Sequence, residues 1–108
     1  MDLGLRGKAA LVGGASRGIG KAVAMGLARE GCRVAICART EKPLLEAADE
    51  IRRNTGVDVL ATVCDMARAG DIERFVATAA EQFGRLDIIV NNAGGPPLGV
   101  FESHSDEA

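Results

Sequence analysis

The segment from Lys8 to Lys21, KAALVGGASRGIGK, constrains the fold of this chain more than any other part of its sequence. The apolar run Ala9 to Val12 is typical of a buried strand, and the spacing of apolar residues after the glycines predicts a helix. A glycine-rich turn between a strand and a helix N-terminus can bring backbone N–H groups close to a phosphate. The segment therefore predicts a phosphate-binding turn, although glycines also serve ordinary turns.

The rest of the chain alternates predicted strands and helices. The strands are expected at Lys8–Gly13, Arg33–Cys37, Val57–Val63 and Leu86–Val90. The helices are expected from Gly18 to about Glu30, from Glu41 to Asn54, and from Gly70 or Asp71 to Phe83. Short connections between such units imply a parallel sheet with helices on both faces. We therefore expect one partial α/β domain over residues 1–108, the N-terminal half of a Rossmann-type doubly wound parallel sheet with strand order 3-2-1-4.

Apolar periodicity predicts which helix faces are buried. These faces are Ile19, Val23 and Leu27 with Ala22 and Gly26 beside them; then Leu44, Leu45, Ala48 and Ile51; then Ile72, Phe75, Val76, Ala79 and Phe83. Residues from Asn91 to about Ser103 are rich in glycine and proline and are expected to form a loop. The fourth strand would then be an unpaired hydrophobic edge, and the chain would be a fragment.

Composition excludes several classes of function. The 108 residues carry a net charge of −2, which gives no electrostatic reason to expect nucleic acid or an anionic membrane as a partner. No apolar run has the length of a membrane span, and the start lacks the features of a signal peptide, so a cytoplasmic location is expected. Cys32, Cys37 and Cys64 lack metal-ligand spacing and His104 is the single histidine, so we expect buried, reduced thiols and no metal site.

The glycines Gly14, Gly18 and Gly20 follow the pattern Gly-x-x-x-Gly-x-Gly. One would permit the turn, one would let the backbone approach a pyrophosphate, and one would let the helix pack on the strand. A triphosphate-binding loop needs a glycine where Ala15 stands and a Ser or Thr where Ala22 stands, so a nucleoside triphosphatase is excluded.

The end of the second strand bears on which dinucleotide binds. Enzymes that use NAD place an acidic residue there to bond the ribose hydroxyls, whereas Ala38 and Arg39 follow Cys37 here. Arg39 could hold a 2′-phosphate, and Arg17 in the turn could reach it from the other side. The sequence thus predicts NADP(H) in preference to NAD(H). The alternative is that Arg39 pairs with Glu41 in solvent and Arg17 caps the loop.

Three motifs together make the chain resemble the short-chain dehydrogenases/reductases, in particular 3-oxoacyl-[acyl-carrier-protein] reductase-like members. They are the turn Gly14–Gly20, Asp65 just past the third strand, and Asn91-Asn92-Ala93-Gly94 after the fourth. Each has a plainer interpretation as turn chemistry. The resemblance implies that the cofactor is held by Gly14, Ser16, Arg17, Gly18, Ile19, Gly20, Arg39, Asp65, Met66, Asn91, Asn92, Ala93 and Gly94. Within this set Asp65 would bond the adenine amino group.

The sequence departs from the family pattern in two places. Gly13 replaces a threonine whose hydroxyl ties the turn to the Asn-Asn-Ala-Gly segment in the family. Gly95-Pro96-Pro97 extends that segment with a stiff stretch, which either shapes the substrate side or is ordinary loop. Ser103, His104 and Ser105 suggest acid–base chemistry but are better explained as a helix N-cap.

The chain contains no tyrosine. The resemblance implies that the proton-donating tyrosine, its lysine, a serine and a further asparagine lie beyond Ala108, so no catalytic residue is expected within 1–108 and the segment alone is expected to be inactive. The complete enzyme would move a hydride between nicotinamide and a small carbonyl or alcohol substrate, such as a 3-oxoacyl thioester, as a homodimer or homotetramer. The alternatives are a dinucleotide-binding module without catalysis and a truncated remnant.

Overall fold

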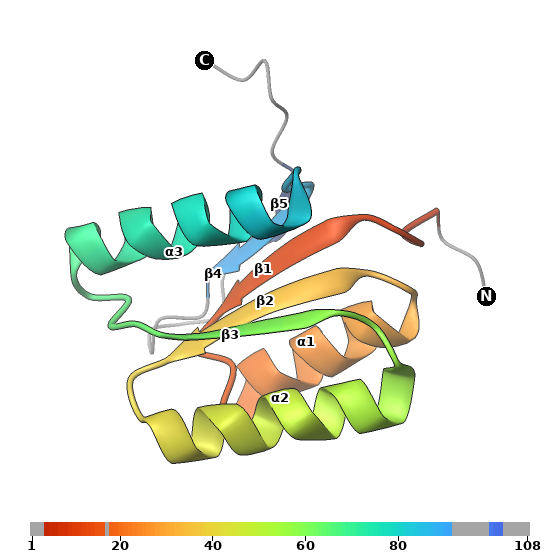
Figure 1. Ribbon diagram of the computed structural model, residues 1–108, viewed down its shortest axis with the longest axis horizontal. Helices are drawn as coiled ribbons and strands as arrows, with labels where there is room; N and C mark the ends of the chain where they lie inside the picture. Colours follow the sequence, from red (N-terminus) through yellow and green to blue (C-terminus); the bar gives the residue numbers. More distant parts are fainter. Residues whose placement is uncertain (1–3, 17, 92–99, 103–108) are drawn as a thin grey trace.

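The fold is a five-stranded sheet with helices on both faces, seen in the computed structural model, which describes residues 4–16, 18–91 and 100–102 (Figure 1). Its elements in chain order are β1 (Ala9–Gly13), α1 (Gly18–Arg29), β2 (Arg33–Ala38), α2 (Glu41–Thr55), β3 (Val59–Val63), α3 (Ala69–Phe83), β4 (Ile88–Asn91) and β5 (Val100–Glu102). The first four strands are parallel, in the order β3-β2-β1-β4, which confirms the predicted α/β fold and strand order.

The helices cover the sheet unequally. Two of them, α1 and α2, lie side by side on one face, and α3 lies alone on the other (Figure 1). Residues along each strand alternate between these layers, as the period of a strand requires. On β1, Ala10 and Val12 pack with the α1 and α2 residues, while Leu11 packs with Phe75 and Ala79 of α3. The central strand is therefore apolar on both faces.

The buried face of α1 differs from the prediction. The helix buries Gly20, Ala24, Met25 and Ala28, whereas Ile19 is 58% exposed. Ala22 and Gly26 are exposed as well, and Val23 and Leu27 pack only at the margin of the core. The small residues Gly20, Ala24 and Ala28 let the helix backbone come close to the sheet, and Met25 is the one large side chain of α1 that is buried with them.

The other two helices follow the prediction more closely. In α2, Leu44, Ala48 and Ile51 are buried as expected, but Leu45 is 50% exposed and Ala47 takes its place in the core. In α3, Phe75 and Ala79 are fully buried. The other three predicted residues are partly buried: Val76 and Phe83 pack against the core, and Ile72 lies outside the core cluster.

The region after β4 also differs from the prediction. Val100–Glu102 forms β5, which pairs antiparallel with β4 through the partners Ile88 and Glu102, Ile89 and Phe101, and Val90 and Val100. The predictions that Asn91 to Ser103 is entirely loop and that the fourth strand is an unpaired edge are therefore wrong. A strand edge carries free N–H and C=O groups, and a short β-prone segment can satisfy them despite nearby glycine and proline.

Candidate functional site: the carboxyl edge of the sheet

The expected binding residues meet at the edge where the parallel strands end. The register places Gly13 at the end of β1 beside Cys37 of β2 and Asn91 of β4. It also places Ala38, the last residue of β2, beside Val63, the last residue of β3. The segments that follow these strand ends therefore start from one edge. The crossover from β1 to β2 runs through α1 on one face of the sheet, whereas the crossover from β3 to β4 runs through α3 on the other face. In open α/β sheets, ligands bind at this kind of switch point.

The turn after β1 has the backbone geometry expected of a phosphate-binding turn. Gly14 and Gly18 have φ angles of 66° and 67°. A residue with a side chain is strained in this left-handed region, so glycine is favoured at both positions. The turn is tied to β2 by the Ala15 N–H, which donates to the Cys37 carbonyl at 3.0 Å. Gly20 is buried in the face of α1 that packs on the sheet. Arg17, which was predicted to bind the cofactor, lies outside the described residues.

The first turn of α1 is suited to an anionic ligand. Its leading N–H groups have no partners within the helix, and it carries no acidic side chain that would repel an anion. The adjacent cation, Lys21, bonds Glu50 of α2 at 2.6 Å and lowers the pKa of that carboxyl group. Lys21 thus links α1 to α2. The backbone N–H groups of the turn can still donate hydrogen bonds to an anionic ligand.

Arg39 stands exposed directly after β2. The preceding residue, Ala38, is 7% exposed, so the strand ends in a small apolar side chain where a carboxylate would bond ribose hydroxyls. Within the described residues Arg39 forms no ion pair with Glu41, so that alternative is not supported. The Arg39 guanidinium is free to meet a ligand.

The loop after β3 holds Asp65 by three hydrogen bonds. Its N–H donates to Asp71 Oδ2 at 2.9 Å, its Oδ1 accepts the Ala67 N–H at 3.0 Å, and its carbonyl accepts the Arg68 N–H at 2.9 Å. Asp65 is therefore a turn residue, as the plainer interpretation holds. Its Oδ2 has no hydrogen-bond partner in the described part of the chain and can still accept one from a ligand.

Met66 reaches from this loop to the end of β1. A Cβ atom added at Gly13 would lie 2.7 Å from Met66 Cε and 3.2 Å from Met66 Sδ, so the methionine fills the space that a side chain at residue 13 would use. The Cys64 thiol lies 3.9 Å from the same sulfur. Met66, which was predicted to bind cofactor, therefore contacts Gly13.

The thiols near this edge are not reactive groups. Burial raises the pKa of Cys37 to about 12 and also raises the pKa of Cys64, so neither is a thiolate at neutral pH. All three cysteines are free and buried, so the prediction of buried thiols is confirmed. No group of three or more His, Cys, Asp or Glu residues within the described ranges could hold a metal ion.

Several predicted positions cannot be placed. Asn91 ends β4 beside Gly13, but Asn92, Ala93 and Gly94 lie outside the described residues, as do Gly95 to Pro97 and Ser103 to Ser105. The sequence analysis missed Asp71, which orients the Asp65 backbone. The sequence feature that could have revealed this role is an acidic residue in the first turn of a predicted helix, six positions after Asp65.

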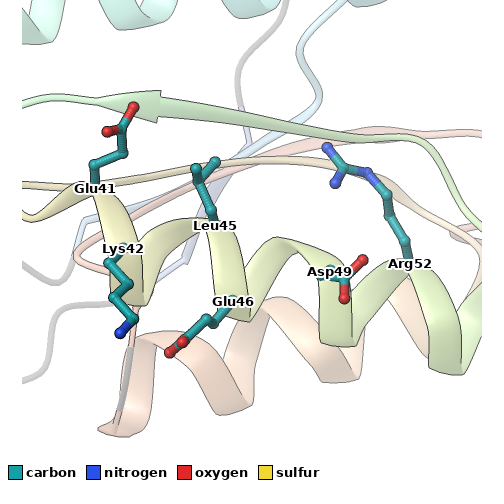
Figure 2. Close-up of a pocket in the computed structure, with 6 residues that line it drawn as sticks. All are labelled: Glu41, Lys42, Leu45, Glu46, Asp49 and Arg52. Carbon is teal, nitrogen blue, oxygen red and sulfur yellow. The ribbon is translucent and has the colours of Figure 1, made fainter.

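A depression on α2 lies outside this site. Figure 2 shows that its six lining side chains all come from one helix: Glu41, Lys42, Leu45, Glu46, Asp49 and Arg52. Three carboxylates and two cations surround the half-exposed Leu45, and no other element contributes a side chain. Charges of both signs on a single open surface do not define a ligand, and we assign no function to this depression.

The fold and the turn define a nucleotide-binding α/β protein of the Rossmann type. The sequence matches the short chain dehydrogenase family over residues 8–108, and the chain belongs to this family. The 3-oxoacyl-[acyl-carrier-protein] reductase FabG of Staphylococcus aureus is 44% identical over 87 residues, which are 81% of this chain and 35% of the relative. The chain spans about a third of the length of the curated relatives it matches.

Solved structures show the same relationship. The L-sorbose reductase of Gluconobacter frateurii, solved with NADPH and L-sorbose, matches with a TM-score of 0.84 and 38% identity, over 99% of this chain and 41% of that chain. An NAD+-bound xylitol dehydrogenase matches with a TM-score of 0.79 and 34% identity, over 84% and 35%. Both cofactors therefore occur among the neighbours. None of the described helices is long and apolar enough to cross a membrane.

Proposed function

We propose that residues 1–108 are the cofactor-binding half of an NADP(H)-dependent oxidoreductase. The observation that carries the proposal is the end of β2, where the buried Ala38 is followed by the exposed Arg39, which has no ion pair in the described part of the chain. A carboxylate at this place would bond the ribose hydroxyls of NAD and repel a 2′-phosphate, whereas Arg39 can pair with that phosphate. The NADPH bound to the sorbose reductase supports the proposal.

Different residues at the carboxyl edge would bind different parts of the dinucleotide. Gly14, Ser16, Gly18, Ile19 and Gly20 would hold the pyrophosphate and its riboses, with Arg17 beside them. Arg39 would hold the 2′-phosphate, and Asp65, through its unused oxygen, the adenine amino group. Met66, which lies against Gly13, would bind the cofactor beside Asp65. Asn91, Asn92, Ala93 and Gly94 would line the adenosine side. When bound, the cofactor supplies or accepts the hydride.

The complete enzyme would act on a small carbonyl or alcohol compound. The 3-oxoacyl-[acyl-carrier-protein] reductase relative favours a 3-oxoacyl thioester as its substrate. The proton donor that such a reaction needs would come from residues outside 1–108. We include assembly as a homodimer or homotetramer and a cytoplasmic location in the proposal; the free, buried thiols favour a reducing compartment.

Fluorescence titration of the complete gene product with NADPH and with NADH tests this proposal. We expect tighter binding of NADPH, and Arg39→Ala should weaken NADPH binding about tenfold or more while changing NADH binding little, because a charge-assisted hydrogen bond contributes about 1.5–3 kcal/mol. Arg29→Ala is the matched control, since Arg29 is an exposed arginine at the far end of α1. Equal losses in both arginine variants, or no binding of either nucleotide by the unaltered protein, would contradict the proposal.

A further inference from the structure

Asp71 makes an unusual contact for an acidic residue at the start of a helix. It lies in the first turn of α3, yet the structure gives this helix no side-chain cap hydrogen bond at its N-cap residue, Arg68. The Asp71 carboxylate instead reaches back to the end of β3, where Oδ2 accepts the Asp65 N–H at 2.9 Å. Its Oδ1 accepts a hydrogen bond from Arg74, one turn further along the helix. One carboxylate thus links the helix to the loop that carries Asp65.

This contact fixes the direction of Asp65. Asp71 holds the backbone N–H, and the other bonds to Asp65 come from Ala67 and Arg68 within the same loop. Met66 packs this loop against Gly13, and the bond from Asp71 attaches the Asp65 backbone itself to α3. Asp65 Oδ2 is left without a partner among the described residues and is held in place.

The charge of Asp71 strengthens the anchor. The hydrogen bond from the Asp65 N–H lowers the pKa of Asp71, and the neighbouring Arg74 lowers it further. The Asp71 side chain is only 22% exposed, so little water competes for the oxygen that Asp65 uses. A hydrogen bond to an ionised carboxylate is shorter and stronger than one between neutral groups.

We propose that Asp71 is a positioning residue, which holds Asp65, the residue to which the proposed function assigns the adenine amino group. The inference rests on the proposed function, because it requires that a dinucleotide binds at the carboxyl edge. Asp71 does not touch the ligand. It keeps Asp65 Oδ2 where an amino group can donate to it, so the loss of Asp71 reduces the contribution of that amino group to binding.

The test compares reduced NADP with its hypoxanthine analogue, in which an oxygen replaces the adenine amino group. The affinity ratio of these two probes is measured by fluorescence titration of the complete gene product and of its variants. We expect the unaltered protein to favour the adenine form by about tenfold, the effect of one well-placed hydrogen bond to a charged group. In Asp71→Ala the ratio should fall towards one, mainly through weaker binding of the adenine form.

Two further variants separate positioning from stability. Asp71→Asn keeps an oxygen that can accept the Asp65 N–H, so it should restore most of the ratio. Glu73→Gln alters an exposed acid on the same turn of α3 and should leave the ratio unchanged. If Asp71→Ala does not fold, Arg74→Ala serves in its place, because freeing Oδ1 loosens the same carboxylate and should lower the ratio by a smaller factor.

The outcomes distinguish this inference from the proposed function. Absence of binding by the unaltered protein would defeat the proposed function and this inference with it. Tight binding with equal affinity for both probes would leave the proposed function standing and overturn base recognition by Asp65. A clear adenine preference that survives in Asp71→Ala, or an equal loss for both probes, would overturn the role of Asp71.

Discussion

The two edges of the sheet are built from different kinds of contact. At the amino edge, Arg33 donates to the Phe83 carbonyl at 2.9 Å and to the Gly7 carbonyl at 3.1 Å, and its guanidinium lies 5.2 Å from the centre of the Phe83 ring. Asp87 accepts the Ala9 N–H at 2.9 Å and pairs with Arg85. At the carboxyl edge, among the residues that the structure describes, Arg39 forms no ion pair and Asp65 Oδ2 accepts no hydrogen bond.

This difference separates the residues that stabilise the fold from those that would bind the ligand. The polar groups at the amino edge satisfy one another, which joins α3, β2 and β1 to the chain before β1. The carboxyl edge combines positive-φ glycines with polar groups that have bonding capacity left. Polar substitutions at the two edges should therefore affect different measurements. Two predictions test this separation, and a third tests how tightly the carboxyl edge is packed at Gly13.

The largest effect is expected at Ala38. Ala38→Asp places a carboxylate where the 2′-phosphate would lie, so the ratio of NADPH to NADH affinity should fall by about ten- to a hundredfold, which corresponds to about 1.4–2.8 kcal/mol. Ala38→Asn has the same shape without the charge and should change the ratio far less. Titration of both variants with both nucleotides measures the effect, and an unchanged ratio in Ala38→Asp would remove the argument for NADP(H).

A stability effect without a binding effect is expected at Arg33. Arg33→Ala leaves the Phe83 and Gly7 carbonyls without their donor and should lower the free energy of unfolding by about 2 kcal/mol. Urea denaturation measures this change, with Arg53→Ala as the control, because the Arg53 side chain is 71% exposed and forms an ion pair with the exposed Asp49 of the same helix. The affinity of the folded Arg33 variant for NADPH should stay within about twofold. A large loss of affinity would show that the two edges are coupled.

A smaller effect is expected where Gly13 meets Met66. The φ angle of Gly13 is not positive, so the backbone accepts a side chain and only Met66 opposes it. Gly13→Thr should destabilise the protein by about 1–2 kcal/mol, as overfilled cores do. In a Met66→Ala background the same substitution should be nearly neutral, since the space is then open. A double-mutant cycle on unfolding free energies measures the coupling, and purely additive values would show that the two residues do not share this space.

The strand order and the position of the site could be predicted because they depend on local patterns. An apolar strand, a glycine turn and a helix recur at known spacing, and parallel strands bring their ends to one edge. The orientation of α1 could not be predicted in this way. Periodicity favoured Ile19, Val23 and Leu27, but the close approach of helix and sheet selects the small residues Gly20, Ala24 and Ala28.

The contacts that were missed all depend on residues distant in sequence or on single side chains. The pairing of β5 is decided by the free edge of β4, which the composition of residues 91–103 does not reveal. The role of Asp71 depends on a bond to a backbone group six residues earlier, and the role of Met66 depends on a side chain that Gly13 lacks. Patterns of residue type predicted which residues gather at the edge, but not how these residues support one another.

The three buried, free cysteines can report when the core of this protein opens. Cys32 and Cys37 are 0% exposed and Cys64 is 2% exposed, in two different layers of the core. An alkylating reagent can reach them only in molecules whose core has opened, so the labelling rate at each sulfur counts those events. Cys32 reports on the layer under α1 and α2, whereas Cys37 and Cys64 report on the layer under α3. Mass spectrometry of the labelled chain would thus measure the opening rate of each core layer separately, with the natural cysteines as probes.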